Sequence, residues 1–414
     1  MRNHAAGPKN VLGYIPVREG EMQKVLAALK DGWAVAYTAE LVRRPSINPP
    51  GEYTAVSAWL VQAFTEMGLE PRVVEAQPGK KNVVARIAGT GGGPSLCLAS
   101  HMDVVNIGEA GKWRYDPFSA HIDDDGVMWG RGSADSKGML AGMMAATRAI
   151  LASKLRLKGN LYLVAYVDDE TAGHYGLRQV FKEGQAKAES LILGEATLFE
   201  IQYVFKARIW FDLETIGRSA HGAFPDRGLN AIDKAYKVIQ AIRGIPLTSH
   251  PKLGRDTINI GMIHGGEQVN VVAGRCHTSF DIRWGPGRTS GDIRRAVKDA
   301  LDRIKGEDPE LVVGEMVVSE ERDPLEFAPD NPLIRATQSA GKMLGREIGL
   351  GGWYSSGELY PVYSAGHIVN GLVIGPGEPW QAHAYDEHIP IRDLQEAARL
   401  YALTALNVCG VAGT

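Results

Sequence analysis

The chain has 414 residues, more than one ordinary hydrophobic core accommodates, so two domains are expected. A hydrophobic content of 44%, a charged content of 22% and a net charge of −3 are globular values, and they exclude an electrostatic basis for binding nucleic acid or an anionic membrane. The three cysteines lie far apart, which argues against a disulfide scaffold. Residues 1–16 lack the pattern of a secretory signal, and no apolar run of about 18 residues could span a membrane. A cytoplasmic protein is therefore expected.

Predicted helices and strands alternate over the first 205 residues. A helix over 20–44 is stopped by Pro45, and an amphipathic helix over 52–67 ends at Gly68. This alternation predicts an α/β sheet with helices on both faces, and such sheets carry functional groups at the carboxyl ends of their strands. The predicted strands are 82–87, 95–100, 160–167 and 190–193, and a helix of small residues runs from the Gly-rich turn 132–138 to near residue 151.

The alternation of predicted strands and helices changes near Lys206, and the earlier pattern resumes near residue 322. Between them the order is strand, helix, two strands and helix, which predicts a small α+β domain over 206–321, inserted into a catalytic domain formed by 1–205 and 322–414. Residues 1–37 are expected to be an N-terminal extension of the catalytic domain. The predicted elements are 208–216, 229–243, 257–264, 276–283 and 291–304 in the insert, then helix 332–344, strand 372–374 and helix 391–408.

Residues of the types that bind metals stand at strand ends or in Gly-rich turns. Each alone has a structural alternative, such as a helix N-cap for Asp135 or a surface histidine beside a capping acid for His101. Together they predict a centre for one or two divalent ions of zinc, manganese or cobalt, since imidazole and carboxylate ligands suit all three. Asp103, two residues after His101 on the same strand face, can hydrogen-bond the imidazole and fix its tautomer. The predicted ligands are His101, Asp135, Glu170, Glu195 and His383.

Asp168, Asp169 and Glu170 place three carboxylates in a row after a buried strand. Their mutual repulsion is destabilising unless cations or water compensate it, and a solvated loop is the structural alternative. The functional interpretation assigns Glu170 to a metal and Asp169 to proton transfer from metal-bound water, which would attack as hydroxide.

With these motifs the sequence resembles the superfamily that contains aminoacylase, acetylornithine deacetylase, succinyl-diaminopimelate desuccinylase and glutamate carboxypeptidase. The resemblance covers residues 38–410. The matching segments are Ser-His-Met-Asp-Val-Val at 100–105, Gly-Arg-Gly-Ser-Ala-Asp-Ser-Lys-Gly at 130–138, Asp-Asp-Glu at 168–170, Gly-Glu-Ala-Thr at 194–197, Ser-Ala-His-Gly at 219–222, Gly-Gly at 265–266 followed by Asn-Val-Val at 270–272, Asp-Ile-Arg at 281–283 and His-Ala-Tyr-Asp-Glu at 383–387.

This resemblance implies a zinc-peptidase-like catalytic domain, with a mixed sheet flanked by helices, and a ferredoxin-like inserted domain that serves as lid and dimerisation domain. It implies that His101 and Glu195 hold one metal and that Glu170 and His383 hold the other, with Asp135 bridging. A homodimer or higher homo-oligomer is implied, in which His221 reaches the partner's active site to stabilise the oxyanion. Asn270 and Arg283 would help to hold the substrate.

Two departures from the family pattern bear on the substrate. The proton-transfer residue is Asp169 where the family has Glu, and a carboxylate displaced by about 1 Å can slow a step as much as a hundredfold. The family's Arg that clamps a substrate carboxylate is missing, because the equivalent segment, 352–358, ends in Glu358 and no Arg occurs between Arg346 and Arg392. Glu358 would favour an amine, a hydroxyl or a structural partner. Arg283 and Arg288, in the insert, either recognise an anionic group or belong to a solvated loop.

The expected function is metal-dependent hydrolysis of a C–N bond in a small molecule other than an ordinary N-acyl amino acid. One alternative is an aminohydrolase that releases ammonia from an aminobenzoate-type aromatic amine. Another is a catalytically inactive binding protein on the same fold, although such a protein would have no need to retain mutually repelling carboxylates.

Overall fold

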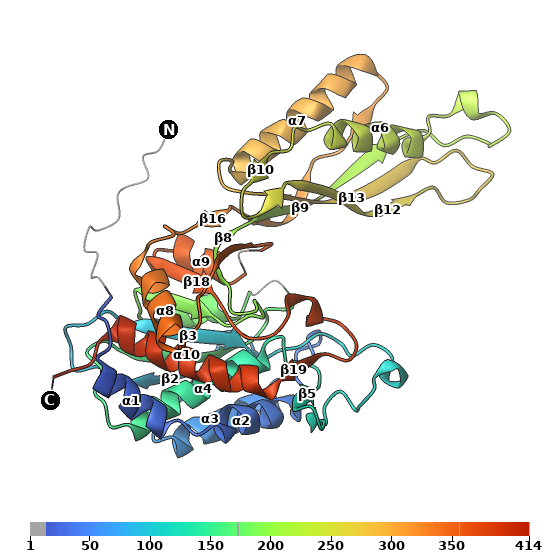
Figure 1. The fold of residues 1–414 in the computed structure, drawn as a ribbon. Helices are drawn as coiled ribbons and strands as arrows, with labels where there is room; N and C mark the ends of the chain where they lie inside the picture. The colour runs from blue at the N-terminus through green and yellow to red at the C-terminus, as the bar shows by residue number, and fades with distance from the viewer. Residues whose placement is uncertain (1–13, 172–173, 356, 414) are drawn as a thin grey trace. The chain divides into compact units, whose positions relative to one another are not determined.

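A computed structural model describes residues 14–171, 174–355 and 357–413. The chain forms two compact units, and each is treated by itself (Figure 1). Unit 1 contains Met1–Tyr203, Phe327–Leu350 and Gly357–Thr414, and unit 2 contains Val204–Glu326 and Gly351–Ser356. The divisions lie close to the predicted ones at 205/206 and 321/322. The sequence did not indicate that residues 351–355 group with unit 2.

A mixed sheet forms the centre of unit 1. β6 (Leu161–Tyr166), β3 (Leu96–His101), β7 (Ser190–Leu193) and β18 (Asn370–Val373) are parallel, so their carboxyl ends meet at one edge. β3 and β6 are buried throughout, as expected of strands covered on both faces. The full order is β1-β2-β6-β3-β7-β18-β8-β16, with β17 paired to β8. The further strands are β1 (Arg72–Glu75), β2 (Lys81–Ile87), β8 (Ile201–Phe205), β16 (Leu325–Glu326) and β17 (Leu350–Trp353). By the division above, β16 and residues 351–353 of β17 are counted with unit 2.

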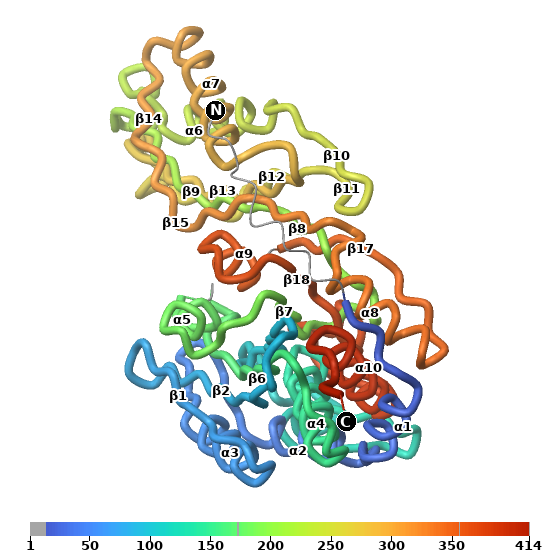
Figure 2. Tube along the Cα trace, turned by 90° about the vertical axis from the view of Figure 1, so that its left-hand side faces the viewer, coloured from blue at the N-terminus to red at the C-terminus, as the bar shows by residue number. Residues whose placement is uncertain are grey.

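Helices flank this sheet. α4 (Lys137–Ala152) and α10 (Ile391–Cys409) pack side by side (Figure 2). Both helices contact β3. Other helices extend this layer or contact β2 and β18. α2 (Gly32–Val42) packs on α4, and α8 (Pro332–Met343) packs on α10. α3 (Thr54–Glu66) and α5 (Leu177–Lys182) both contact β2, and α9 (Leu359–Ser364) contacts α5 and β18. A small separate sheet has the order β19-β5-β4, made of His388–Pro390, Val127–Trp129 and His121–Ile122.

The single helix predicted over residues 20–44 is wrong. The structure has α1 (Glu19–Ala28) and then α2, because Leu29 takes an extended conformation and the chain turns before Gly32, which lets both helices pack on α4. The described part of the predicted N-terminal extension belongs to the core as well. Val25 and Ala34 are buried, and Val17 donates its amide hydrogen to the Asn407 side chain of α10.

Unit 2 is an antiparallel sheet with two amphipathic helices. The chain order is β9 (Ala207–Ile216), α6 (Ala231–Arg243), β12 (Thr257–Gly265), β13 (Arg275–Trp284), α7 (Ser290–Glu307) and β15 (Val317–Arg322). The sheet order is β12-β13-β9-β14, with β14 at Val312–Val313 and β15 also pairing with β9. This is the ferredoxin-like arrangement, so the predicted fold class is confirmed for both units.

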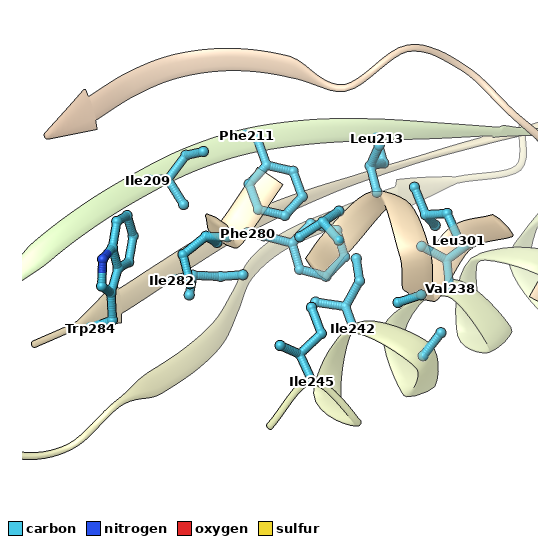
Figure 3. Close-up of a cluster of buried hydrophobic side chains, with 14 of the residues drawn as sticks. Ile209, Phe211, Leu213, Val238, Ile242, Ile245, Phe280, Ile282, Trp284 and Leu301 are labelled. Carbon is cyan, nitrogen blue, oxygen red and sulfur yellow. The ribbon is translucent and has the colours of Figure 1, made fainter. Parts of the chain in front are cut away.

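Buried and partly exposed residues alternate along β9, and this pattern explains how the core of unit 2 forms. Its inward residues are buried and its outward residues are partly exposed, so one face of the sheet meets α6 and α7. Phe211 of β9 stacks on Phe280 of β13 with ring centroids 5.0 Å apart. Figure 3 shows this cluster, which includes Ile209, Leu213, Val238, Ile242, Ile245, Ile282, Trp284 and Leu301. Within the described residues, no helix of either unit has the length and apolar character needed to cross a bilayer.

Candidate metal centre

His101 is the last residue of β3, and its imidazole is oriented by the backbone. Its Nδ1 lies 2.9 Å from the main-chain carbonyl oxygen of Asp103, to which it donates. Its Nε2 then faces two carboxylates, 3.1 Å from Oδ1 of Asp135 and 3.7 Å from Oε1 of Glu195. A backbone acceptor on one nitrogen and carboxylates around the other is the usual environment of a metal-binding histidine.

The second oxygen of Asp135 faces a second group of ligand-type residues. Nε2 of His383 lies 3.4 Å from Oδ2 of Asp135 and 3.0 Å from Oε2 of Glu170. Within each group, His101–Asp135–Glu195 and Asp135–Glu170–His383, one ligand atom per residue lies within 4.8 Å of the others. The fold therefore gathers all five predicted ligands around the carboxylate of Asp135.

The electrostatics of this cluster fit divalent cations. Burial, together with the charge of Asp135, raises the pKa of Glu195 to about 8 and the pKa of Glu170 to about 7. Burial acts to lower the pKa of His101, but the neighbouring Glu195 and Asp135 outweigh it and raise that pKa well above its ordinary value. Two imidazoles and three carboxylates, one buried and two half-buried, are a donor set that suits zinc, manganese or cobalt, and bound cations would keep the carboxylates ionised.

Glu387 holds the loop that carries Asp135. Its buried carboxylate accepts hydrogen bonds from the amides of Gly132, Ala134 and Asp135 at 2.9–3.0 Å, and it pairs with Nη1 of Arg131 at 2.7 Å. Sequence reasoning missed this role. The available signal was an acid at the end of the matched segment 383–387, directly before a strand.

Asp103 acts differently from the prediction. Its carbonyl, rather than its carboxylate, accepts from His101, since Oδ1 lies 3.6 Å from Nδ1. The carboxylate accepts from Nδ2 of Asn48 at 2.9 Å and from the amides of Asp169 and Glu170 at 3.4 and 3.2 Å. Asp103 therefore ties the loop after β6 to the end of β3.

Each of the three consecutive carboxylates has a partner of its own, so the solvated-loop alternative is wrong. Asp168 is buried with φ of 70°, and its carboxylate pairs with Nζ of Lys80 at 2.8 Å. Asp169 accepts from the hydroxyl of Tyr166 at 3.1 Å, and Glu170 faces His383. Asp169 belongs to neither ligand group, yet its charge contributes to the raised pKa values of His101 and Glu195.

The structure favours a structural partner for Glu358 over a contact with substrate. The residue is 1% exposed, and its carboxylate accepts from the amide of Arg178 at 3.0 Å and pairs with Nη2 of that residue at 3.4 Å. Arg178 lies in the first turn of α5, so the acid caps the start of this helix. The predicted contact of Glu358 with substrate finds no support in this buried position.

The other predicted substrate residues lie in unit 2. Arg283 donates to Asp281 and to the carbonyl of Tyr354, and Arg288 pairs with Asp256, so both guanidinium groups have partners within the unit. His221 is exposed, and the loops that carry His221 and Asn270 pair, with Gly222 donating to the carbonyl of Asn270 at 2.7 Å.

Comparison with known proteins identifies the family of this chain and solved structures with a similar fold. The profile of peptidase family M20/M25/M40 matches residues 97–407. Acetylornithine deacetylase of Salmonella typhimurium is 28% identical over 389 residues, which is 89% of this chain and 96% of that enzyme.

Three solved structures have the same fold. Aminopeptidase PepT of Bacillus cereus superposes with a TM-score of 0.76 at 21% identity over 92% of this chain and 99% of its own. An M20 metallo-carboxypeptidase of Sulfolobus solfataricus gives 0.75 at 19%, over 91% and 99%. The YXEP protein of Bacillus subtilis, described as a dinuclear metal-binding peptidase, gives 0.70 at 14%, over 95% and 100%.

Proposed function

Since this chain belongs to peptidase family M20/M25/M40, and is a metal-dependent hydrolase of C–N bonds, we propose that it cleaves an amide of a small molecule other than an ordinary N-acyl amino acid. The observation that carries the hydrolytic part of this proposal is the position of Asp135, whose two oxygens face two separate histidines at 3.1 and 3.4 Å.

His101, Asp135 and Glu195 would hold one cation, and Asp135, Glu170 and His383 the second. Divalent ions held by these residues would polarise a scissile carbonyl and lower the pKa of water toward neutrality. Glu387 and Asp103 keep the ligands in place, because their carboxylates fix the backbone of Asp135 and of Glu170.

Asp169 is the proposed proton-transfer residue. It adjoins Glu170, lies outside both ligand groups and is partly exposed, so its carboxylate can accept a proton from the attacking water and deliver it to the leaving nitrogen. This assignment and those of the five ligands are proposals that rest on geometry.

The substrate proposal rests on three cations of unit 1 that are each paired with an acid. Arg131 pairs with Glu387, Lys80 with Asp168 and Arg178 with Glu358, and no Arg occurs between residues 346 and 392. A carboxylate beside the cleaved bond would have to compete with these acids. We therefore propose a substrate that is neutral or carries an amine at this position.

A second candidate is an aminohydrolase acting on an aromatic amine. The observation that favours it is Trp380, a 64% exposed side chain three residues before His383 on the same loop. An exposed ring in the segment that carries a ligand-type residue can stack on an aromatic substrate.

A homodimer through unit 2, with His221 reaching the partner's centre, is also proposed. Its support is a group of large apolar side chains exposed on unit 2: Phe224, Ile232, Tyr236, Met262, Ile263 and Val269. An active protein that sediments as a monomer would overturn this part of the proposal.

The experiment is a turnover comparison with zinc-, manganese- or cobalt-loaded protein. N-acetylornithine and other N-acetyl amino acids are each paired with their carboxamides, next to dipeptides, dipeptide amides and aminobenzoates. We expect the member of each pair that lacks the carboxylate to have at least the kcat/KM of the carboxylate. A preference of tenfold or more for the carboxylates would contradict the substrate proposal, and ammonia release from aminobenzoates would select the second candidate.

A further inference from the structure

A buried tyrosine lies beside the proposed proton-transfer residue. Tyr166 is the last residue of β6 and has no exposed surface, and its hydroxyl donates to Oδ1 of Asp169 at 3.1 Å. A buried phenol requires a hydrogen-bond partner, and the partner of this phenol is a carboxylate beside the metal centre.

The sheet holds Tyr166 against a metal-ligand residue. Tyr166 is paired in register with His101 of β3, and the two rings meet edge to face with centroids 6.1 Å apart. The position of the hydroxyl is therefore set by the same two strands that position His101.

Asp169 is held at two points. Its amide donates to Oδ1 of Asp103 at 3.4 Å, which holds the main chain, and the phenol of Tyr166 holds one carboxylate oxygen. With Oδ1 engaged, Oδ2 is the oxygen left to exchange a proton. The phenol is the donor in this bond, because a carboxylate oxygen accepts.

We propose that Tyr166 is a positioning residue for catalysis, whose hydroxyl orients the Asp169 carboxylate so that Oδ2 faces the reacting atoms. This inference rests on the proposed role of Asp169. It also gives the short aspartate side chain a physical means of correct placement, since an error of about 1 Å in a reacting group can cost a hundredfold in rate.

The first experiment removes the hydroxyl alone. Tyr166→Phe is compared with wild type for kcat and KM on the fastest amide of the panel above, per zinc-loaded molecule, with zinc content and thermal unfolding measured alongside. We expect kcat to fall about tenfold, KM to change less than about twofold and zinc content to stay the same. Tyr162→Phe is the matched control, because Tyr162 is a buried tyrosine on the same strand, and it should leave kcat unchanged.

The second experiment tests coupling between the two side chains. A glutamate is one methylene longer, so its carboxylate would no longer lie at the Tyr166 hydroxyl. In the Asp169→Glu background, Tyr166→Phe should therefore cost less than about twofold in kcat. Equal losses in both backgrounds, or an unchanged kcat in Tyr166→Phe, would overturn the inference. Near-normal turnover in Asp169→Asn would instead overturn the proposed role of Asp169, and the absence of amide turnover in the metal-loaded wild type would overturn the proposed function, so the failures are distinguishable.

Discussion

The buried carboxylate of Glu387 accepts the amide hydrogen of Asp135 at 3.0 Å, across 252 positions of sequence. This bond fixes the residue that faces both histidines of the metal centre. The same carboxylate is the partner of Arg131, so it combines loop anchoring with charge compensation.

Glu387→Gln should weaken both functions. A glutamine of the same shape leaves the buried Arg131 unpaired and loses acceptor capacity toward the loop, so the free energy of unfolding should fall by about 3 kcal/mol. Zinc affinity should fall with it. The measurements are chemical denaturation and zinc titration, with Glu183→Gln on the surface as control. Unchanged zinc affinity would separate Glu387 from the metal centre.

Asp135→Asn should affect both ligand groups at once. Because each oxygen of Asp135 faces a different histidine, we expect loss of most bound metal, whereas Glu195→Gln and Glu170→Gln should each lower occupancy at one position. Elemental analysis of the purified variants checks this. Full metal content in Asp135→Asn would contradict the bridging assignment.

Chelation of wild type should abolish activity, and zinc, manganese or cobalt should restore it to different degrees.

Asp169→Asn should retain fold and metal and lose most of the rate. Without an ionised carboxylate the proton transfer has no acceptor, so kcat should fall by about a hundredfold or more. Steady-state kinetics with parallel elemental analysis measures this, and Asp116→Asn, in an exposed loop, is the control.

Glu358→Gln should change stability and leave substrate preference unaltered. The substitution removes the charge that pairs with Arg178 and caps α5, so the melting temperature should fall. The kcat/KM ratio between carboxylate and carboxamide substrates should stay the same. An altered ratio would return Glu358 to the substrate site.

Asp308 should make the stability of unit 2 depend on pH. Hydrogen bonds from Lys234 and Lys237 lower its pKa from 3.8 to about 2. A carboxylate whose pKa is lowered in the folded state stabilises above its unfolded pKa, and this stability is lost as pH falls from about 4 to about 2.

Asp308→Asn should therefore destabilise α6 and α7 by about 1 kcal/mol at pH 7, and by less at pH 3. Hydrogen exchange of peptides from these helices in the full chain reports the local effect. A difference between variant and wild type that grows toward acid pH would contradict the assigned ion pairs.

The sequence by itself determined the fold class and the position of the chemistry along the chain. Apolar strands that end at His101, before Asp168 and before Glu195 indicate the carboxyl edge of a parallel sheet, and parallel strands bring such ends together whatever their separation in sequence. The alternation of apolar and polar residues along β9 likewise indicated a second, antiparallel unit. This signal is visible in the sequence because a period of two residues is a local property of a strand.

Only the tertiary structure decided which groups compensate which charges. Lys80 pairs with Asp168, Arg178 with Glu358 and Glu387 with Arg131, and none of these pairs has a spacing that a helix or strand period encodes. The same holds for the break between α1 and α2, which follows from packing on α4. Periodicity records which face of an element is buried, whereas the partner of a buried charge is set by long-range packing, since burial penalises any charge that remains unpaired.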